Sequence, residues 1–167
     1  ARHADNVAPA LFGGLCLCLP EGRIDTLPAP DWHLTVVHPQ TVIKTAEARA
    51  VLPQDVPMPD ALRQMARLGH FVHCCHTGDA MEAAFALEDA LAEPHRIPLQ
   101  PHFADVKAAA MQAGARAGGI SGSGPSSYWI SFDADTAQNV GQAISNVLLL
   151  KGLDHHVHVG RIASRGA

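Results

Sequence analysis

The apolar residues of this 167-residue chain follow two spacings, one typical of strands and one typical of helices. Short runs of alternating, β-branched or aromatic residues predict strands at 15–19, 32–38, 127–132 and 157–162. We expect the first two strands to pair, with residues 20–30 as their connection. Beyond residue 60, apolar side chains recur every three or four positions, which predicts one face of a helix. These side chains are Leu62, Met65, Leu68, Val72 and Cys75.

Capping and helix-breaking residues predict the other helices. Those helices are expected at 5–13, 45–52, 81–91, 101–117 and from 133 or 135 to 151. Asp60 and Asp79 are expected N-caps, because a carboxylate there accepts hydrogen bonds from free backbone N–H groups. Pro94 is expected to stop the helix at 81–91, since proline disfavours a helical conformation in the preceding residue. Strands interspersed with helices predict an α+β fold with a four-stranded antiparallel sheet.

The composition is that of a globular protein, with 47% apolar and 17% charged residues. A formal net charge of −4 provides no basic surface, which argues against nucleic acid as a partner. The longest apolar run, residues 147–150, is too short to cross a membrane, and no membrane association is expected. No secretion signal opens the sequence, so we expect a cytoplasmic protein. The four cysteines form two close pairs that are poor disulfide partners, which favours free thiols.

A run of glycines and serines at residues 118–125 is a candidate ligand-binding loop. Glycine permits positive φ angles and a close approach of ligand to backbone, and consecutive N–H groups can converge on an anion. The run matches neither the G-x-x-x-x-G-K-[ST] loop nor a dinucleotide fingerprint, and it leads into a predicted strand rather than a helix. A flexible turn without a ligand is the alternative.

Polar side chains gather at the start of the chain, where His3, Asp5 and Asn6 lie within four residues. They supply the hydrogen-bond donors and acceptors that a polar substrate requires. Equally, the same residues could act as the cap and turn of the short helix predicted at 5–13.

Two arginines are candidates for binding an anion. Arg49 lies one turn after Thr45, so both project from the same helix face near its N-terminus. A guanidinium there can hold a carboxylate through two hydrogen bonds. Arg96 follows the expected helix stop at Pro94, which would direct it into a pocket. Arginines that face solvent are the alternative at both positions.

Histidines form two groups that raise the possibility of a metal site. His70, His73 and His76 are three residues apart on one predicted helix, and three more lie within 155–158. Zinc and copper use such ligands. However, three-residue steps spread side chains by about 60° around a helix, and no C-x-x-C or H-E-x-x-H motif is present. We assign no metal site, and a His-rich metal-binding protein is kept as an alternative.

Four segments are similar, in the same order, to segments of one family. Residues 3–9 read H-A-D-N-V-A-P and resemble the H-x-D-N-V-A-P segment of homoserine kinases. Residues 45–53 read T-A-E-A-R-A-V-L-P and resemble that family's T-A-E-A-R-x-x-L-P stretch, while residues 93–96 resemble its E-P-[YH]-R. Residues 119–126 resemble the third motif of the wider GHMP kinase superfamily. Chance is a poor explanation for four ordered matches.

The resemblance implies a kinase that transfers the γ-phosphoryl group of ATP to the side-chain hydroxyl of L-homoserine, on the route to threonine. It implies L-homoserine and ATP as partners, with Mg²⁺ as a cofactor, and it is compatible with a homodimer. The substrate-binding residues that it implies are His3, Asp5, Asn6, Thr45, Arg49, His73 and Arg96. The phosphate-side loop that it implies contains Gly119, Ser121, Gly122, Ser123 and Gly124.

The resemblance also implies a domain arrangement. Residues 20–167 would form the C-terminal domain of these kinases, a ferredoxin-like antiparallel sheet with helices on one face. Residues 1–19 would be a remnant of the N-terminal nucleotide-binding domain. The superfamily's P-x-x-x-G-L-G-S-S-A motif and the acidic residue expected to hold Mg²⁺ are absent from these 167 residues. We therefore expect the C-terminal portion of a kinase, inactive by itself, with a non-catalytic α+β module as the alternative.

Overall fold

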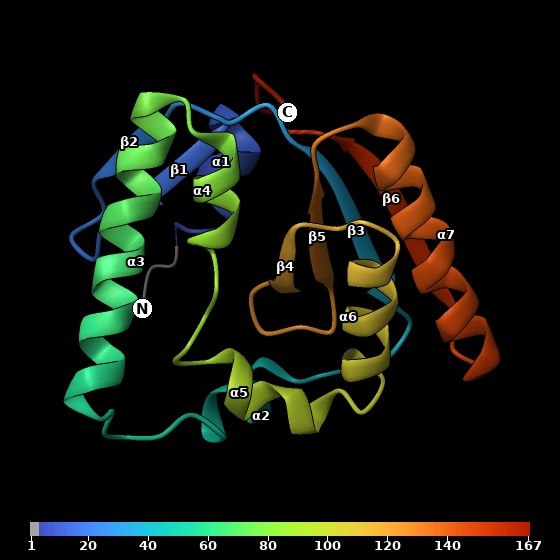
Figure 1. Ribbon diagram of the computed structural model, residues 1–167. Helices are drawn as coiled ribbons and strands as arrows, with labels where there is room; N and C mark the ends of the chain where they lie inside the picture. The colour runs from blue at the N-terminus through green and yellow to red at the C-terminus, as the bar shows by residue number, and fades with distance from the viewer. Residues whose placement is uncertain (1–3) are drawn as a thin grey trace.

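The computed structural model describes residues 4–167, which form two antiparallel sheets and the helices around them (Figure 1). The main sheet consists of β3 (His33–Pro39), β4 (Ala117–Ile120), β5 (Ser127–Ser131) and β6 (His155–Arg161). The small sheet pairs β1 (Leu15–Cys18) with β2 (Ile24–Leu27). The α-helices are α1 (Val7–Phe12), α2 (Thr45–Ala50), α3 (Met58–Thr77), α4 (Ala80–Phe85), α5 (Glu93–Arg96), α6 (Phe103–Gln112) and α7 (Ala134–Leu150). A 3₁₀ helix, η1 (Ile97–Leu99), follows α5 directly. No helix in the described part of the chain is both long and apolar enough to span a membrane.

The main sheet has the connectivity of a ferredoxin-like fold. Its strand order is β4-β5-β3-β6, and each neighbouring pair is antiparallel. The chain passes from β3 through helices α2–α6 to β4, turns into β5, and returns through α7 to β6. The predicted α+β class with an antiparallel sheet is therefore confirmed.

Helices α6 and α7 cover one face of the main sheet (Figure 1). Thr35 and Val37 of β3 are fully buried, because alternate residues of a strand share a face. The Thr35 hydroxyl donates a hydrogen bond of 2.8 Å to the backbone oxygen of Ala137, which ties α7 to the sheet. The core between helices and sheet consists of Val37, Phe103, Val106, Ala110, Ala115, Trp129, Val140, Ile144 and Leu148.

A second apolar cluster joins the sheet to α3 and α4. Its buried members are Trp32, Cys74, Ala83, Ala84 and Ile130. The indole N–H of Trp32 donates to the backbone oxygen of Ala80 at 2.9 Å, so a hydrogen bond as well as packing orients this ring. Asp79 caps α4 as predicted, since its carboxylate accepts from the Glu82 N–H.

The predicted pairing of the first two strands is wrong. β1 pairs with β2, which lies inside the segment expected to be only a connection. A tight turn closes this hairpin, with the Gly22 N–H donating to the Leu19 oxygen at 2.9 Å. β3 instead lies between β5 and β6, and β4 completes the main sheet in place of β1. The boundary proposed at residue 19 falls within the β1–β2 hairpin.

Part of the apolar face predicted on α3 is exposed. Leu62, Met65 and Leu68 are 56%, 69% and 50% exposed, whereas Cys75 is buried. The last turns of α3 therefore supply its contribution to the second cluster. Asp60 lies in the first turn of α3 rather than at its N-cap, which is Pro57.

Close packing explains why β4 contains two consecutive glycines. A Cβ atom on Gly118 would overlap the backbone oxygen of Tyr128 and the ring of Trp129. A Cβ atom on Gly119 would overlap the carboxylate of Glu93. Both positions have ordinary φ angles, so glycine is needed here for the close approach of neighbouring groups. The prediction that Gly118 and Gly119 belong to a loop is wrong, because both lie in this strand.

Replacing Gly118 by alanine is expected to lower the free energy of unfolding by about 1–3 kcal/mol, the usual effect of overpacking a filled site. Gly69→Ala is the matched control, because open space surrounds this position in the middle of α3. There alanine should raise the free energy of unfolding by about 0.5–1 kcal/mol through its helix propensity. Urea denaturation measures both. Equal effects of the two substitutions would contradict the packing account of β4.

Candidate substrate and phosphate site

Helices α2 and α5 lie together at one end of the molecule (Figure 1). Thr45 is the first residue of α2 and Arg49 follows one turn later, so the two exposed side chains share a helix face. Arg96, the last residue of α5, donates from Nε to the backbone oxygen of Ala48 at 3.3 Å. The structure therefore brings together three of the predicted substrate-binding residues.

Helix α5 forms where the sequence was expected to stop a helix. Asp89 holds the turn that precedes it, because its Oδ1 accepts from the N–H groups of Leu91 and Ala92 at 2.8 Å. Its Oδ2 accepts from the Glu93 N–H at 3.1 Å. Pro94 lies in the first turn, where its missing N–H would have no intrahelical partner anyway. The prediction that Pro94 stops the helix expected at 81–91 is therefore wrong, because α4 ends at Phe85 and Pro94 lies in the first turn of α5.

The glycine–serine segment is held against α5 by two side chains. Glu93 Oε2 accepts from the backbone N–H of Ile120 at 3.0 Å, and its Oε1 accepts from Lys107 Nζ at 3.0 Å. Arg96 Nη1 donates to the backbone oxygen of Gly122 at 2.7 Å. Arg96 consequently connects α2 and the loop, because its other hydrogen bond goes to Ala48.

The loop itself, residues 121–126, is a tight turn with free N–H groups at its tip. The Gly124 N–H donates to the Ser121 oxygen at 3.0 Å, and the Ser121 N–H donates to the Ser126 oxygen at 2.8 Å. Gly122 and Gly124 have φ angles of 58° and 80°, which favour glycine. The N–H groups of Gly122 and Ser123 donate to no described residue. Such free consecutive N–H groups can bind an anion.

Other predicted site residues lie elsewhere. Asp5 and Asn6 precede α1, which lies at the opposite end of the molecule from α2 and α5 (Figure 1). His73 lies near the far end of α3, about 22 Å along the helix from Met58 at a rise of about 1.5 Å per residue. Its ring stacks on that of His70, with centroids 6.5 Å apart. His3 is outside the described residues.

No metal site is evident in the described part of the chain. His70 approaches Glu82 at 3.3 Å and Cys74 at 3.5 Å. Nevertheless, no group of three or more His, Cys, Asp or Glu side chains within residues 4–167 is arranged to hold a metal ion. The described residues therefore provide no complete protein cage for a metal ion, and no chemical step is assigned to Mg²⁺, which commonly takes only one or two carboxylates beside substrate phosphates.

Three residues of the site escaped the sequence reasoning. Glu93 binds the N–H of Ile120, just before the loop, and Lys107 binds the Glu93 carboxylate. Gln100 packs against Gly124, the last glycine of the loop. The E-P-H-R segment already contained Glu93, so its acidic side chain beside the predicted Arg96 was a usable signal. Lys107 and Gln100 gave no such signal in the sequence, because their positions depend on how α6 and η1 pack.

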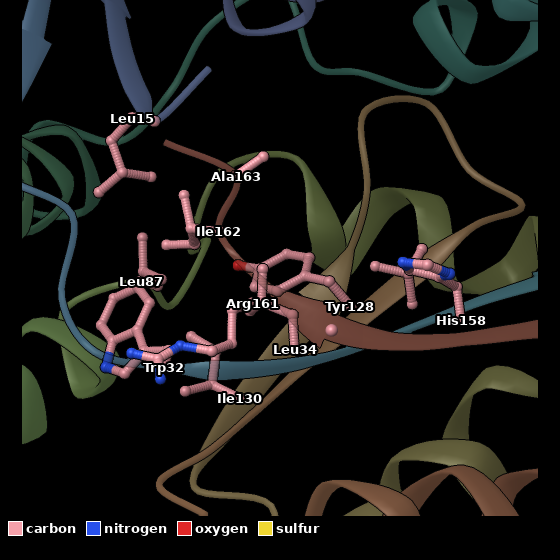
Figure 2. A pocket seen from close by; sticks show the side chains of 13 residues that line it. Leu15, Trp32, Leu34, Leu87, Tyr128, Ile130, His158, Arg161, Ile162 and Ala163 are labelled. Carbon is pink, nitrogen blue, oxygen red and sulfur yellow. The ribbon is translucent and has the colours of Figure 1, made fainter. Parts of the chain in front are cut away.

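The cavity in Figure 2, of about 450 Å³, borders this site at Tyr128, which lies near Glu93. Its walls are mainly apolar and include Leu15, Trp32, Leu34, Leu87 and Ile130. None of the predicted site residues that the structure describes lines it. Burial and the nearby Glu93 and Asp89 raise the pKa of Tyr128, which also lines it, to about 12, so this phenol is neutral at physiological pH. Such a surface is poorly suited to a phosphorylated ligand.

The comparison with known families agrees with the fold. The family model described as GHMP kinases C terminal matches residues 60–148, more than half of the chain. The chain therefore belongs to the GHMP kinases, through the C-terminal domain of that family.

Within that family the chain is similar to homoserine kinases. It is 41% identical over 173 residues to the homoserine kinase of Chlorobium phaeobacteroides. The alignment covers 100% of this chain and 54% of that relative. The crystal structure of homoserine kinase from Cytophaga hutchinsonii has a TM-score of 0.95 and 34% identity, over 99% of this chain and 54% of that one. The resemblance drawn from the four sequence segments is confirmed.

More distant structures share only the fold. The L. major mevalonate kinase in complex with R-mevalonate has a TM-score of 0.69 at 14% identity, over 98% of this chain and 53% of that one. The chain spans about half the length of the homoserine kinases that it matches.

Glu93→Ala is expected to lower the free energy of unfolding by about 1–3 kcal/mol, because it leaves the Ile120 N–H without its acceptor. The Glu93 side chain is only 11% exposed, so water replaces the carboxylate poorly. Chemical denaturation and amide hydrogen exchange at Ile120 check this. Glu21→Ala, at an exposed residue of the β1–β2 turn, should change the free energy by less than about 0.5 kcal/mol. The same small effect for Glu93→Ala would contradict its role.

Proposed function

We propose that this protein carries the amino-acid side of a homoserine kinase, which forms ADP and O-phospho-L-homoserine from ATP and L-homoserine in threonine biosynthesis. One observation supports this most strongly. Arg96 hydrogen bonds both to α2, which carries Thr45 and Arg49, and to the glycine loop at Gly122. An amino-acid substrate and a phosphate chain must lie side by side for phosphoryl transfer, and Arg96 spans these two places.

The carboxylate of L-homoserine would bind to Arg49 and Arg96. Arg96 uses Nε and Nη1 toward the protein, and the other N–H groups of its guanidinium are suited to a carboxylate. Thr45 would add a hydroxyl from the same face of α2 as Arg49. His3, Asp5 and Asn6 are proposed to orient the substrate's amino group and hydroxyl, and His73 to lie nearby. These four roles stay predictions. For Asp5 and Asn6 they require that α1 move toward α2, and for His73 that the end of α3 do so.

The phosphate groups of ATP would lie against the free N–H groups of Gly122 and Ser123. Phosphoryl transfer depends mainly on positioning and charge stabilisation, so the residues of this site need not include a strong base. Mg²⁺ is expected to act in the reaction, with its ligands outside residues 4–167.

Several finer features remain predictions. We propose that residues 20–167 form the C-terminal domain and that residues 1–19 belong to a nucleotide-binding domain. A cytoplasmic location and a homodimer also stay proposals.

Steady-state kinetics with L-homoserine and ATP, on these residues joined to a nucleotide-binding domain of the family, test this function and separate the two arginines. Arg49→Ala should raise KM for L-homoserine about 10²-fold with little change for ATP, because a charged hydrogen bond to the carboxylate is lost. Arg96→Ala should raise KM for both substrates, because it also releases the loop at Gly122. Arg63→Ala, an exposed residue on α3, is the control and should leave both constants unchanged.

Two outcomes would contradict the assignment. The first is the absence of homoserine-dependent ADP formation by these residues joined to a nucleotide-binding domain of the family, which would favour a non-catalytic module. The second is an equal effect of Arg49→Ala on both substrates, which would remove the carboxylate role.

A further inference from the structure

Gln100 is a buried polar residue that the chemistry above does not use. It is 1% exposed, and it follows η1 directly. Its side-chain Oε1 and Nε2 have no hydrogen-bond partner among the described residues. A buried amide without partners is unfavourable, and an apolar side chain of the same size would avoid that loss.

The backbone of Gln100 does not explain this choice of residue. Its N–H donates to the Ile97 oxygen at 2.9 Å, and its oxygen accepts from the Phe103 N–H at 2.8 Å. Any residue except proline could make both of these backbone bonds. The side chain is therefore the part of Gln100 that lacks a structural reason.

The side chain lies directly against the glycine loop. A Cβ atom on Gly124 would overlap Gln100 Nε2 and would lie 3.1 Å from its Cδ. Three side chains thus contact this segment in order along the chain. Glu93 binds Ile120, just before the loop, Arg96 binds Gly122, and Gln100 lies against Gly124. The first two form hydrogen bonds with the loop backbone, whereas the third only makes a van der Waals contact.

The loop has the freedom to complete this third attachment. Gly122 and Gly124 lack side chains, which widens the range of backbone conformations open to the loop. The Gly122–Ser123 peptide unit is held by the bond from Arg96 to the Gly122 oxygen, whereas the Ser123–Gly124 unit is held by the bond from the Gly124 N–H to Ser121. A rotation of the second unit would exchange that bond for one to the Gln100 amide, which lies against Gly124, and would leave the Arg96 bond in place.

We propose that Gln100 is a positioning residue for anion binding by the loop: its amide hydrogen bonds to the backbone at Ser123–Gly124 when the loop binds a phosphate group. The buried amide gains its partner in that conformation alone, so it favours the loop geometry that holds the anion. The identity of the anion as the phosphate chain of ATP rests on the proposed function, whereas the coupling between Gln100 and the loop does not.

Inorganic pyrophosphate is the probe, and Gln100→Met is the variant, because methionine matches glutamine in size and lacks strong hydrogen-bonding groups. The dissociation constant for pyrophosphate should rise about tenfold. The free energy of unfolding should be unchanged or higher, because an unpartnered buried amide is removed. Gln138→Met, on the exposed side of α7, is the matched control and should alter neither quantity.

NMR of the wild-type protein supplies a signature that a purely structural role would not give. Pyrophosphate should shift the backbone N–H signals of Gly122 and Ser123 together with the side-chain NH₂ signals of Gln100. Three results would overturn the proposal: no pyrophosphate binding by the wild type, unchanged affinity in Gln100→Met, or loop shifts without a shift of the Gln100 NH₂ group. If the protein passes these tests but does not phosphorylate L-homoserine even when joined to a nucleotide-binding domain of the family, the proposed function is refuted and this inference stands.

Discussion

The candidate site depends on the attachment of one short segment, residues 93–100, to the glycine loop. Glu93 is central, because its carboxylate accepts from both the Ile120 N–H and Lys107. That pair of bonds joins α5, α6 and the end of β4 at one point. Arg96 then extends the attachment to Gly122 and to α2. Without these bonds, a loop of glycines and serines would have little reason to keep one conformation.

The main sheet gives this arrangement a rigid base. β4 lies at the edge of the sheet, and Gly118 lets it pack closely on Tyr128 and Trp129. Trp129 is fully buried in the core under α6, which also carries Lys107. The core thus sets the position of β4 and α6, and Glu93 transmits that position to α5. Loops that carry function are commonly placed by a rigid scaffold in this way.

Much of this molecule could be predicted from local sequence patterns. Asp79 caps its helix as expected, Asp133 is the one of the two predicted helix starts that caps α7, and the β5–α7–β6 order follows from periodicity and turn signals. Strand pairing was harder, because the short alternation in β2 is weak and β4 reads as A-G-G-I. A strand with two glycines is recognisable only when its packing partners are known. Pro94 was misread because proline can stop one helix or start another, and the turn that Asp89 holds before α5 distinguishes the two.

In the site, too, local sequence patterns could be predicted, whereas contacts that depend on tertiary packing could not. Thr45 and Arg49 were predictable because they are neighbours on one helix, and Arg96 because it belongs to a short segment typical of the family. Lys107 and Gln100 become part of the site only through tertiary packing. Asp5, Asn6 and His73 were grouped with the others by resemblance, while in this structure they belong to more distant elements.

The central claim is that Arg96 links the carboxylate-binding face of α2 to the glycine loop. The most direct measurement is an NMR titration of the protein with L-homoserine, following the backbone N–H signal of Gly122. L-homoserinamide is the matched ligand, because it differs only in lacking the carboxylate. The account predicts that L-homoserine shifts the Gly122 signal and that the amide does not. Equal shifts with both ligands, or shifts confined to α2, would contradict it.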